Sequence, residues 1–391
     1  MTLNDVTMNL PTYPMEALAK IRQDLVDAGT RVFDFGTGDP RIPTWAPIKQ
    51  AMKDSIPEIS QYPSINGSPE LRKSIWGYCE RRFSYQESDD LDLIPTNGSK
   101  EAVFHIALSL VGRAGGRKSI LYPNPGYPVY KSSILFSGGT PVPINLDADD
   151  GFKIKPWDLP ESVQADAAAL WINYPHNPTG STADEGYLKE IIAWCQKRDV
   201  ILLSDDCYTD IYHSSWDNSG ERPHHILKYG HKNILSFMSL SKRSGLTGYR
   251  SGFILGDRKL IGSIRKARAN FGVGTPLPIQ AAATVAWNDD EHVAERRKIF
   301  TERLDYCFER LQKMNMIQDR PQAGFYLWCP LREDDDDITF SLDLAKHGVI
   351  TSPSQWLSEG IKGYVRLAMV PDQQDLKPAM DIMETFVTKR Y

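Results

Sequence analysis

The sequence predicts an α/β protein with a mainly parallel sheet in a large domain and a second, smaller α+β domain. Through the middle of the chain, short apolar segments alternate with segments of helical period, which is typical of βαβ units. Small and polar residues follow three of the apolar segments, at the edge where parallel sheets bind ligands. After residue 290 a long charged helix leads into short strands, which indicates a different, α+β arrangement.

The elements of the large domain follow from their apolar patterns. Residues 184–198 place apolar side chains at helical spacing, so we expect an amphipathic helix there. Residues 200–204 and 233–239 are nearly continuous apolar runs, which are typical of strands buried on both faces of a sheet. By these criteria the predicted elements are, in order, a helix at 101–111, strands at 119–122 and 167–173, the helix at 184–198, and strands at 200–204, 233–239 and 253–255.

The smaller domain is expected to begin with a charged helix near residue 290. The predicted boundaries are an N-terminal arm with part of the small domain at 1–45, the large domain at 46–290 and the small domain at 291–391. We expect the acidic run 333–337 to be a solvated loop, because the ligand spacing of a calcium loop is missing. The predicted elements are a helix at 290–314, strands at 324–328, 348–350 and 363–368, and a final helix.

Composition argues against several classes of protein. The formal net charge is −5 and no block of Lys and Arg occurs, so we expect neither nucleic acid nor a membrane surface as partner. No stretch is long and apolar enough for a membrane span, and no signal-peptide pattern opens the chain. The five cysteines are odd in number and lack a Cys-x-x-Cys pair, so we expect reduced thiols, a cytoplasmic protein and no metal site.

Lys242 is the most informative residue of the sequence. It follows the apolar run 234–238 and lies in the segment from Ser239 to Arg250. A partly desolvated ε-amine loses its proton more easily and forms a Schiff base with an aldehyde. Ser239, Ser241 and Arg250 are placed to hold a phosphate of the same molecule. Pyridoxal 5′-phosphate (PLP) carries both groups, so this segment predicts a PLP site.

Asp205 provides the second part of the predicted site. It follows the apolar run 200–204, and a carboxylate buried there is costly without a cation. A protonated pyridine nitrogen supplies one, with an attraction of about 4 kcal/mol at ~4 Å and an effective dielectric of ~20. That attraction keeps the ring protonated as an electron sink. Tyr208 is placed to donate to the phenolate oxygen of the ring. A helix cap is the alternative role for the acid.

Four further segments suit the same molecule, although each has a simpler structural explanation. Ser99 and Lys100 open a helix whose amides point at an anion, but small polar residues cap most helices. Tyr127 is either a ring that stacks on the pyridine or a core residue. Asn177 is either a donor to the phenolate or part of a turn. Arg366, within an apolar strand, binds a substrate carboxylate or an internal acid.

Together these segments resemble the class I/II aminotransferases, PLP-dependent enzymes of fold type I, across essentially the whole chain. Residues 239–250 match the family's Ser-x-Ser-Lys…Arg motif, and residues 177–180 match its Asn-Pro-x-Gly motif. Residues 204–208 match Ser-Asp-Glu-x-Tyr, with Asp206 in place of the Glu. The resemblance implies a large domain with a seven-stranded, mainly parallel sheet between helices. It also implies a transaminase that moves an amino group between an amino acid and a 2-oxo acid.

The resemblance gives each site residue a role. Lys242, Asp205 and Tyr208 are the implied catalytic residues. Gly38, in a segment that resembles the family's Gly-Glu-Pro loop, approaches the substrate carboxylate, and Tyr62 crosses to the cofactor phosphate of a second subunit, which implies a homodimer. The predicted cofactor contacts are Ser99, Lys100, Tyr127, Asn177, Asp205, Tyr208, Ser239, Lys242, Arg250 and Tyr62; the predicted substrate contacts are Gly38, Asn177 and Arg366.

The sequence says less about the substrate. Aspartate-type members use a further arginine, and the matching position here holds Asn270, so simple aspartate specificity is not expected. Residues 10–18 are similar to the start of bacterial N-succinyldiaminopimelate aminotransferases. Glutamate with 2-oxoglutarate is the expected second pair. A PLP-dependent lyase or synthase with the same cofactor residues stays an alternative, whereas a DNA-binding regulator or a non-catalytic protein is not favoured.

Overall fold

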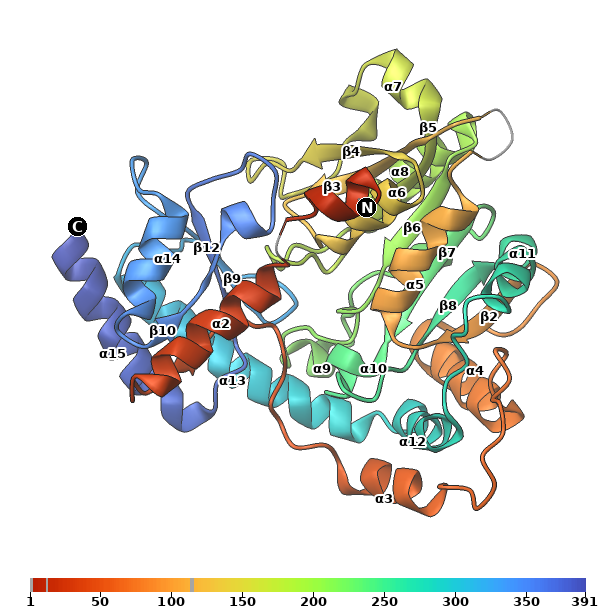
Figure 1. Ribbon diagram of the computed structural model, residues 1–391, viewed down its shortest axis with the longest axis horizontal. Coiled ribbons are helices and arrows are strands. Elements are labelled where there is room, and N and C mark those ends of the chain that lie inside the picture. The colour runs from red at the N-terminus through yellow and green to blue at the C-terminus, as the bar shows by residue number, and fades with distance from the viewer. Residues whose placement is uncertain (1–2, 12, 113–115) are drawn as a thin grey trace.

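The computed structural model describes residues 3–11, 13–112 and 116–391, so Thr12 of the segment 10–18 lies outside the described residues. Its centre is a seven-stranded sheet flanked by helices (Figure 1). The strand order is β2-β8-β7-β6-β5-β3-β4. The strands are β2 (Leu91–Thr96), β3 (Ser119–Asn124), β4 (Thr140–Asn145), β5 (Ala167–Ile172), β6 (Ile201–Asp205), β7 (Ile234–Ser239) and β8 (Gly252–Asp257). The predicted α/β class is confirmed.

The direction of one strand and the identity of both edge strands were not predicted from the sequence. Strands β3 to β7 pair in parallel, but β8 is antiparallel to both of its neighbours, β2 and β7. Strands β2 and β4, which form the two edges of the sheet, were not predicted from the sequence. Pro95 lies in β2, and Pro141 and Pro143 lie in β4. A proline has no N–H for the ladder and is tolerated on edge strands, so these segments do not have the composition of central strands.

The two faces of the sheet are covered by different helices. Because successive side chains of a strand point to opposite faces, Leu203 packs with one helix layer and Leu202 with the other. The first layer contains α5 (Ser99–Ile106), α6 (Val129–Phe136) and α11 (Arg258–Arg268). The second contains α3 (Ala46–Asp54), α4 (Pro69–Phe83), α8 (Glu185–Arg198) and α12 (Leu277–Asn288). Shorter helices are α1 (Asp5–Asn9), α7 (Glu161–Asp166), α9 (Trp216–Ser219) and α10 (Leu240–Arg243).

A second group of elements lies to the left of the large sheet in Figure 1. An antiparallel sheet has the order β11-β12-β9, and β1 pairs in parallel with β10, so the start of the chain joins its C-terminal part. The strands are β1 (Phe33–Asp34), β9 (Tyr326–Pro330), β10 (Val349–Ile350), β11 (Ser352–Pro353) and β12 (Tyr364–Ala368). The helices are α2 (Pro14–Asp27), α13 (Glu291–Lys313), α14 (Asp337–Ala345) and α15 (Gln373–Arg390). The boundaries near residues 45 and 290 stay predictions.

The acidic run 333–337 is only in part the solvated loop that the sequence predicted. Its first two residues are exposed, but Asp336 caps α14 through the backbone N–H of Thr339, and Asp337 begins that helix with its side chain fully buried. Asp337 accepts hydrogen bonds from Ser354 and Gln355 instead of facing water.

No helix among the described residues is long and apolar enough to cross a membrane.

Candidate functional site

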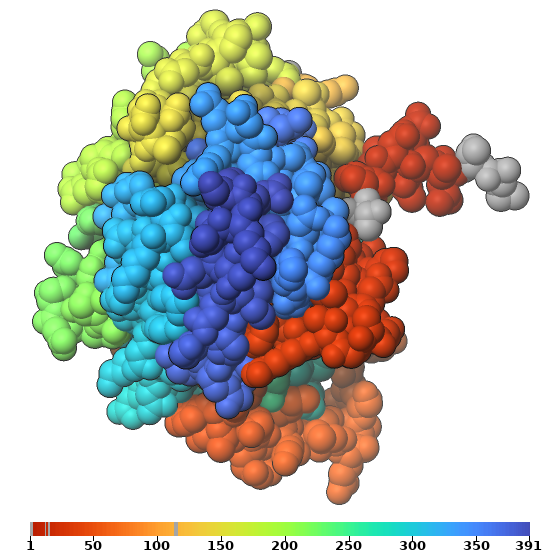
Figure 2. All heavy atoms as spheres, turned by 90° about the vertical axis from the view of Figure 1, so that its left-hand side faces the viewer, coloured from red at the N-terminus to blue at the C-terminus, as the bar shows by residue number. Residues whose placement is uncertain are grey.

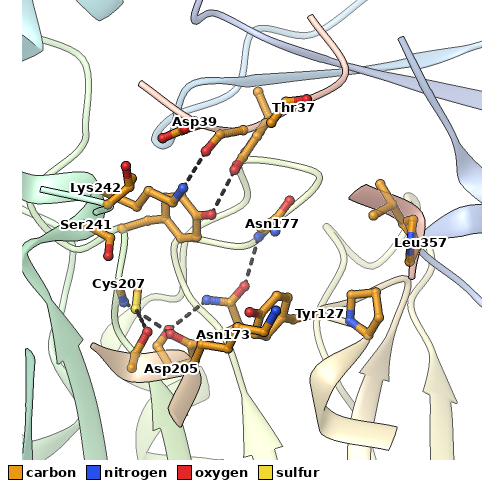
Figure 3. A pocket seen from close by; sticks show the side chains of 18 of the residues that line it. Thr37, Asp39, Tyr127, Asn173, Asn177, Asp205, Cys207, Ser241, Lys242 and Leu357 are labelled. Carbon is orange, nitrogen blue, oxygen red and sulfur yellow. Dashed lines mark hydrogen bonds between the residues drawn. The ribbon is translucent and has the colours of Figure 1, made fainter. Parts of the chain in front are cut away.

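A cavity of about 570 Å³ lies beyond the carboxyl ends of β5, β6 and β7, where the second group of elements meets the large sheet (Figure 3). Asn173 follows β5, Asp205 ends β6, and Lys242 lies in α10 directly after β7. Arg366 of β12 and the loop that contains Gly38 close the cavity from the other side. Parallel strands that end at one edge therefore gather these side chains, as the sequence predicted.

Lys242 projects into this cavity from a firmly held helix. Its ammonium donates a hydrogen bond to the carbonyl oxygen of Gly38. The neighbouring Arg243 is buried and donates to Asp210 at 3.0 Å and to the carbonyl of Ala286 at 2.8 Å, which fixes α10. A Cβ at Gly38 would overlap the hydroxyl of Tyr326, so only glycine brings this backbone so close to the lysine.

Asp205 is a buried carboxylate that no cationic side chain of the described residues neutralises. Tyr130 donates to its Oδ2 at 2.9 Å, and the backbone N–H of Cys207 lies 3.4 Å from its Oδ1. Burial raises the pKa of Asp205, because both donors compensate only part of the lost hydration. No Lys, Arg or His among the described residues forms an ion pair with it. The site therefore has a place for a positive charge from outside the described chain.

Asn173 links the ends of two strands. Its side-chain amide donates to the carbonyl of Asp205 at 2.7 Å, and its Oδ1 accepts the backbone N–H of Asn177 at 2.9 Å (Figure 3). The loop with Asn177 is thereby fixed relative to β6. The Asn177 side chain in turn accepts a hydrogen bond from Arg366 at 3.0 Å.

Arg366 is a buried guanidinium that no carboxylate neutralises within the described residues. It is 3% exposed, and its Nη2 donates to the carbonyl of Gly36 at 2.7 Å. Its Nε, although buried, has no hydrogen-bond partner in the described part of the chain. A buried charge with unused donors is costly unless an anion binds. The internal salt bridge considered above as the simpler explanation is therefore not formed within the ranges that the structure describes.

The tyrosines near the cavity are held by one another and by a cation. The Tyr208 hydroxyl lies 2.8 Å from that of Tyr326, and burial raises the pKa of Tyr208. Tyr127 packs edge to face on Tyr130 with 5.7 Å between ring centroids. The Lys100 ammonium lies 4.1 Å from the centroid of the Tyr13 ring. The tyrosines that line the cavity are Tyr13, Tyr127, Tyr208 and Tyr326.

Hydroxyl and guanidinium groups gather at the N-terminus of α5. Gly98 precedes this helix with φ of 75° and no side-chain cap, and a Cβ there would lie 2.7 Å from the Arg250 guanidinium. Arg250 donates to the carbonyl of Thr247 at 2.8 Å. Ser99, Ser241, Thr247 and Arg250 all line the cavity. Helix N-termini with such donors favour anions.

Two predicted residues lie elsewhere. Ser239 does not line the cavity, since its hydroxyl accepts the backbone N–H of Ser241 at 3.1 Å and donates to the Ser241 hydroxyl at 3.0 Å. Ser241 is the residue of that pair that lines it. Tyr62 is fully exposed on the segment between α3 and α4, away from the cavity of its own chain.

Sequence reasoning missed several contributors. Tyr130 and Tyr326 were not singled out, because an aromatic residue in a helix or strand is typical of a core. The spacing of Tyr127 and Tyr130 gave no clear signal of their contact either, because Tyr127 precedes α6 and only Tyr130 lies in that helix. Asn173 and Tyr13 were quoted within segments but were given no role in the site.

The groups present fit PLP. Asp205 has the negative charge that a protonated pyridine needs, and the N-terminus of α5 with Ser99, Ser241 and Arg250 forms a cup for a phosphate. The Lys242 amine faces the same cavity. Arg366, with its unused Nε, adds a place for a carboxylate. These groups are the ones that a phosphorylated pyridine aldehyde and an amino acid require.

The family model described as aminotransferase class I and II matches residues 30–382. The chain is 33% identical over 377 residues to the LL-diaminopimelate aminotransferase of Aquifex aeolicus (strain VF5), covering 95% of each protein. It is 31% identical over 382 residues to the enzyme of that name from Syntrophobacter fumaroxidans (strain DSM 10017 / MPOB), covering 96% of each.

Solved structures of similar fold include several aminotransferases. The aminotransferase AspB of Helicobacter pylori 26695 has a TM-score of 0.85 and 29% identity, covering 97% of this chain and 99% of that one. An aminotransferase of Neisseria meningitidis Z2491 has a TM-score of 0.87 and 28% identity, covering 99% and 100%. A probable N-succinyldiaminopimelate aminotransferase of Thermus thermophilus has a TM-score of 0.86 at 23% identity, covering 95% and 100%, which supports the fold alone.

Proposed function

This chain belongs to the class I and II aminotransferases, and from that premise we propose that it transfers an amino group between LL-diaminopimelate and 2-oxoglutarate. It is a PLP-dependent transaminase. The proposed donor is supported by relatives with that name at 31–33% identity over nearly the whole chain. The observation that carries the proposal is that the Lys242 amine and the unpaired Asp205 carboxylate line one cavity.

We propose that four sets of residues hold the cofactor, one each for its pyridine nitrogen, phenolate oxygen, ring face and phosphate. Asp205 pairs with the pyridine nitrogen, and Asn177 and Tyr208 contact the phenolate oxygen. Tyr127 stacks on the ring. When bound, PLP serves as the electron sink that makes the substrate Cα–H acidic. The residues proposed to bind its phosphate are Ser99, Lys100, Ser241 and Arg250, with Ser239 supporting Ser241.

Lys242 is the proposed base and acid. Its amine, when neutral, is placed to take the proton from the substrate Cα, and the resulting ammonium would hold that proton for return on the cofactor side of the substrate nitrogen. Its present hydrogen bond to the Gly38 carbonyl keeps the amine on the substrate side of the cavity.

Arg366 is the proposed ligand of the substrate α-carboxylate. Its guanidinium offers a two-pronged hydrogen bond, and the backbone at Gly38 approaches the same group. Because both LL-diaminopimelate and 2-oxoglutarate carry such a carboxylate, one arginine serves both halves of a ping-pong reaction. Aspartate-type members have an arginine at the position that holds Asn270 here, so the sequence agrees with an amino donor other than aspartate.

A homodimer is part of the proposal. Exposed apolar side chains are Leu3 and Met8 near α1, which projects from the body in Figure 2, and Ile56, Ile59 and the ring of Tyr62 between α3 and α4. Contiguous exposed apolar surface marks interfaces, and we propose that these side chains lie in one. We propose that Tyr62 reaches the cofactor phosphate of the other subunit.

A panel of amino donors with 2-oxoglutarate tests this function through glutamate formation. We expect LL-diaminopimelate to exceed N-succinyldiaminopimelate, aspartate, alanine and phenylalanine in kcat/KM. N-succinyldiaminopimelate is the second candidate donor, favoured by the sequence of residues 10–18. A higher kcat/KM for that compound would reverse the assignment. Release of ammonia and a 2-oxo acid without any acceptor would instead indicate a lyase.

A further inference from the structure

The loop between β11 and β12 joins the substrate end of the cavity to the large sheet. Ser352 of β11 lies opposite Arg366 of β12, and Ser352 Oγ is 3.3 Å from Arg366 Nη2. Between these strands, residues 354–361 extend toward the end of β3. Leu357 of this segment lines the cavity, on the far side of Tyr127 from Lys242 in Figure 3.

The tip of this segment is fastened to the large sheet by Glu359. Its carboxylate accepts hydrogen bonds from Lys131 Nζ at 2.6 Å and from the Tyr122 hydroxyl. Its backbone pairs with the buried side chain of Asn124: Glu359 N–H donates to Asn124 Oδ1 at 2.8 Å, and Asn124 Nδ2 donates to the Glu359 carbonyl at 2.9 Å. Gly126 N–H donates to the Leu357 carbonyl at 2.9 Å.

The base of the segment is fastened just as closely to α14. The buried Asp337 carboxylate accepts from the Ser354 hydroxyl at 2.8 Å and from the Gln355 N–H at 2.9 Å. The segment is therefore held at both ends, one on α14 and one at the end of β3 in the large sheet. Burial raises the pKa of Glu359, but Lys131 and Tyr122 outweigh it and hold the pKa below its usual range, so the carboxylate stays ionised at neutral pH.

We propose that Glu359 is a positioning residue that, by holding residues 354–361 against the end of β3, sets the place of Arg366 and Leu357 relative to Lys242. Glu359 itself does not line the cavity. Its effect is on substrate binding, because Arg366 comes from the small sheet and Lys242 from the large one. This inference rests on the proposed role of Arg366 as the carboxylate ligand.

Substitution of Glu359 tests this inference in the PLP-loaded enzyme. We expect Glu359→Ala to raise KM for both LL-diaminopimelate and 2-oxoglutarate by about ten- to a hundredfold, as for a misplaced binding group. The visible absorbance of the cofactor and the Tm should not change. An unchanged KM would overturn the proposal, and so would a loss of cofactor and Tm in parallel with KM, since a merely structural residue behaves that way.

Two controls show whether an increase in KM comes from loss of the ion pair between Glu359 and Lys131 or from a general effect of removing a carboxylate. Glu384→Ala removes another exposed carboxylate, bonded to Arg310 at 2.6 Å between α13 and α15, and should leave KM unchanged. The exchange of charges in Lys131→Glu with Glu359→Lys should reverse part of the increase in KM that each single change causes. No recovery in the double variant would contradict the role of the ion pair.

Hydrogen exchange gives a readout that does not depend on substrate. Backbone amides at 354–361 should exchange faster in Glu359→Ala than in the wild type, and equal rates would overturn the proposal. Arg366→Ala, measured alongside, separately tests whether Arg366 binds the substrate carboxylate, which the proposal assumes. If Arg366→Ala leaves KM unchanged, the carboxylate assignment fails, and the exchange rates then decide alone whether Glu359 holds the segment.

Discussion

At the scale of the residue, the buried charge of Asp205 decides how the site works. Its pKa is raised by burial, and no cation of the described chain offsets that cost. In our proposal, a protonated ring that binds next to Asp205 offsets this cost. The same carboxylate that is costly to bury in the folded chain is therefore the group proposed to hold the cofactor ring.

Asp205→Asn keeps the size of the side chain but removes its charge. We expect kcat to fall about a thousandfold, because the attraction of about 4 kcal/mol at ~4 Å that keeps the ring protonated is lost. Steady-state kinetics with saturating PLP measure this. Asp206→Asn changes the adjacent buried carboxylate, which does not line the cavity, and should keep most of the wild-type kcat. A kcat within tenfold of wild type for Asp205→Asn would contradict the assigned role.

Single residues at strand ends were readable from the sequence, whereas partners across the fold were not. Lys242 and Asp205 stand out because a charged residue directly after an apolar strand has few structural explanations. Tyr326 gave no such signal, because its hydroxyl meets that of Tyr208 only through tertiary packing of residues 118 positions apart. Ser239 and Ser241 are equally plausible in sequence, and only the direction of each hydroxyl distinguishes them.

At the scale of the element, α10 is held in place by a buried charge cluster. Asp210 accepts hydrogen bonds from Arg243 at 3.0 Å, from Arg82 at 2.9 Å and from the Tyr78 hydroxyl at 2.7 Å. Burial raises the pKa of Asp210, but the two guanidinium groups outweigh it and lower the pKa to about 2. This cluster joins α4 to the helix that contains Lys242.

Asp210→Asn leaves both guanidinium groups without this carboxylate, so we expect the free energy of unfolding to fall by about 3–5 kcal/mol. Urea titration at neutral pH measures the loss. Since the folded pKa is depressed, the wild type has this stabilisation above the ordinary aspartate pKa and loses it as pH falls toward 2. The difference between the two proteins should therefore shrink below about pH 4. A difference that does not depend on pH would contradict the ionised cluster.

The sequence predicted the central strands of the large sheet but not the direction of β8 or the two edge strands. The central strands were found because they are continuous apolar runs. The antiparallel direction of β8 was not, because the connection at 240–251 is long enough for either direction and the outcome depends on how α10 packs. Edge strands β2 and β4 contain prolines that a central strand would exclude. The acidic run near Asp337 shows that a charge-rich segment still begins a helix with a buried carboxylate when donors surround it.

At the scale of the whole molecule, we propose that two subunits complete each site. Within one chain Tyr62 touches no part of the cavity, although the segment around it is apolar and exposed. If Tyr62 completes the partner's phosphate site, a variant without Tyr62 and a variant without Lys242 each retain what the other lacks.

Mixing two variants tests shared sites. Lys242→Ala should be inactive and Tyr62→Ala should bind PLP weakly, since it lacks one phosphate donor. After unfolding and refolding together, a hybrid dimer has one site with both residues intact, so activity should exceed the sum of the separate variants at low PLP. Activity no greater than that sum, or a monomer by light scattering, would contradict the shared site.

The most direct test of the central claim is to find which lysine holds the cofactor. Borohydride reduction of the PLP-loaded protein fixes the cofactor to the amine that holds it, and peptide mapping then locates the label. The account predicts a single labelled peptide that contains Lys242. A label on another lysine, or no label in a protein that still transaminates, would contradict it.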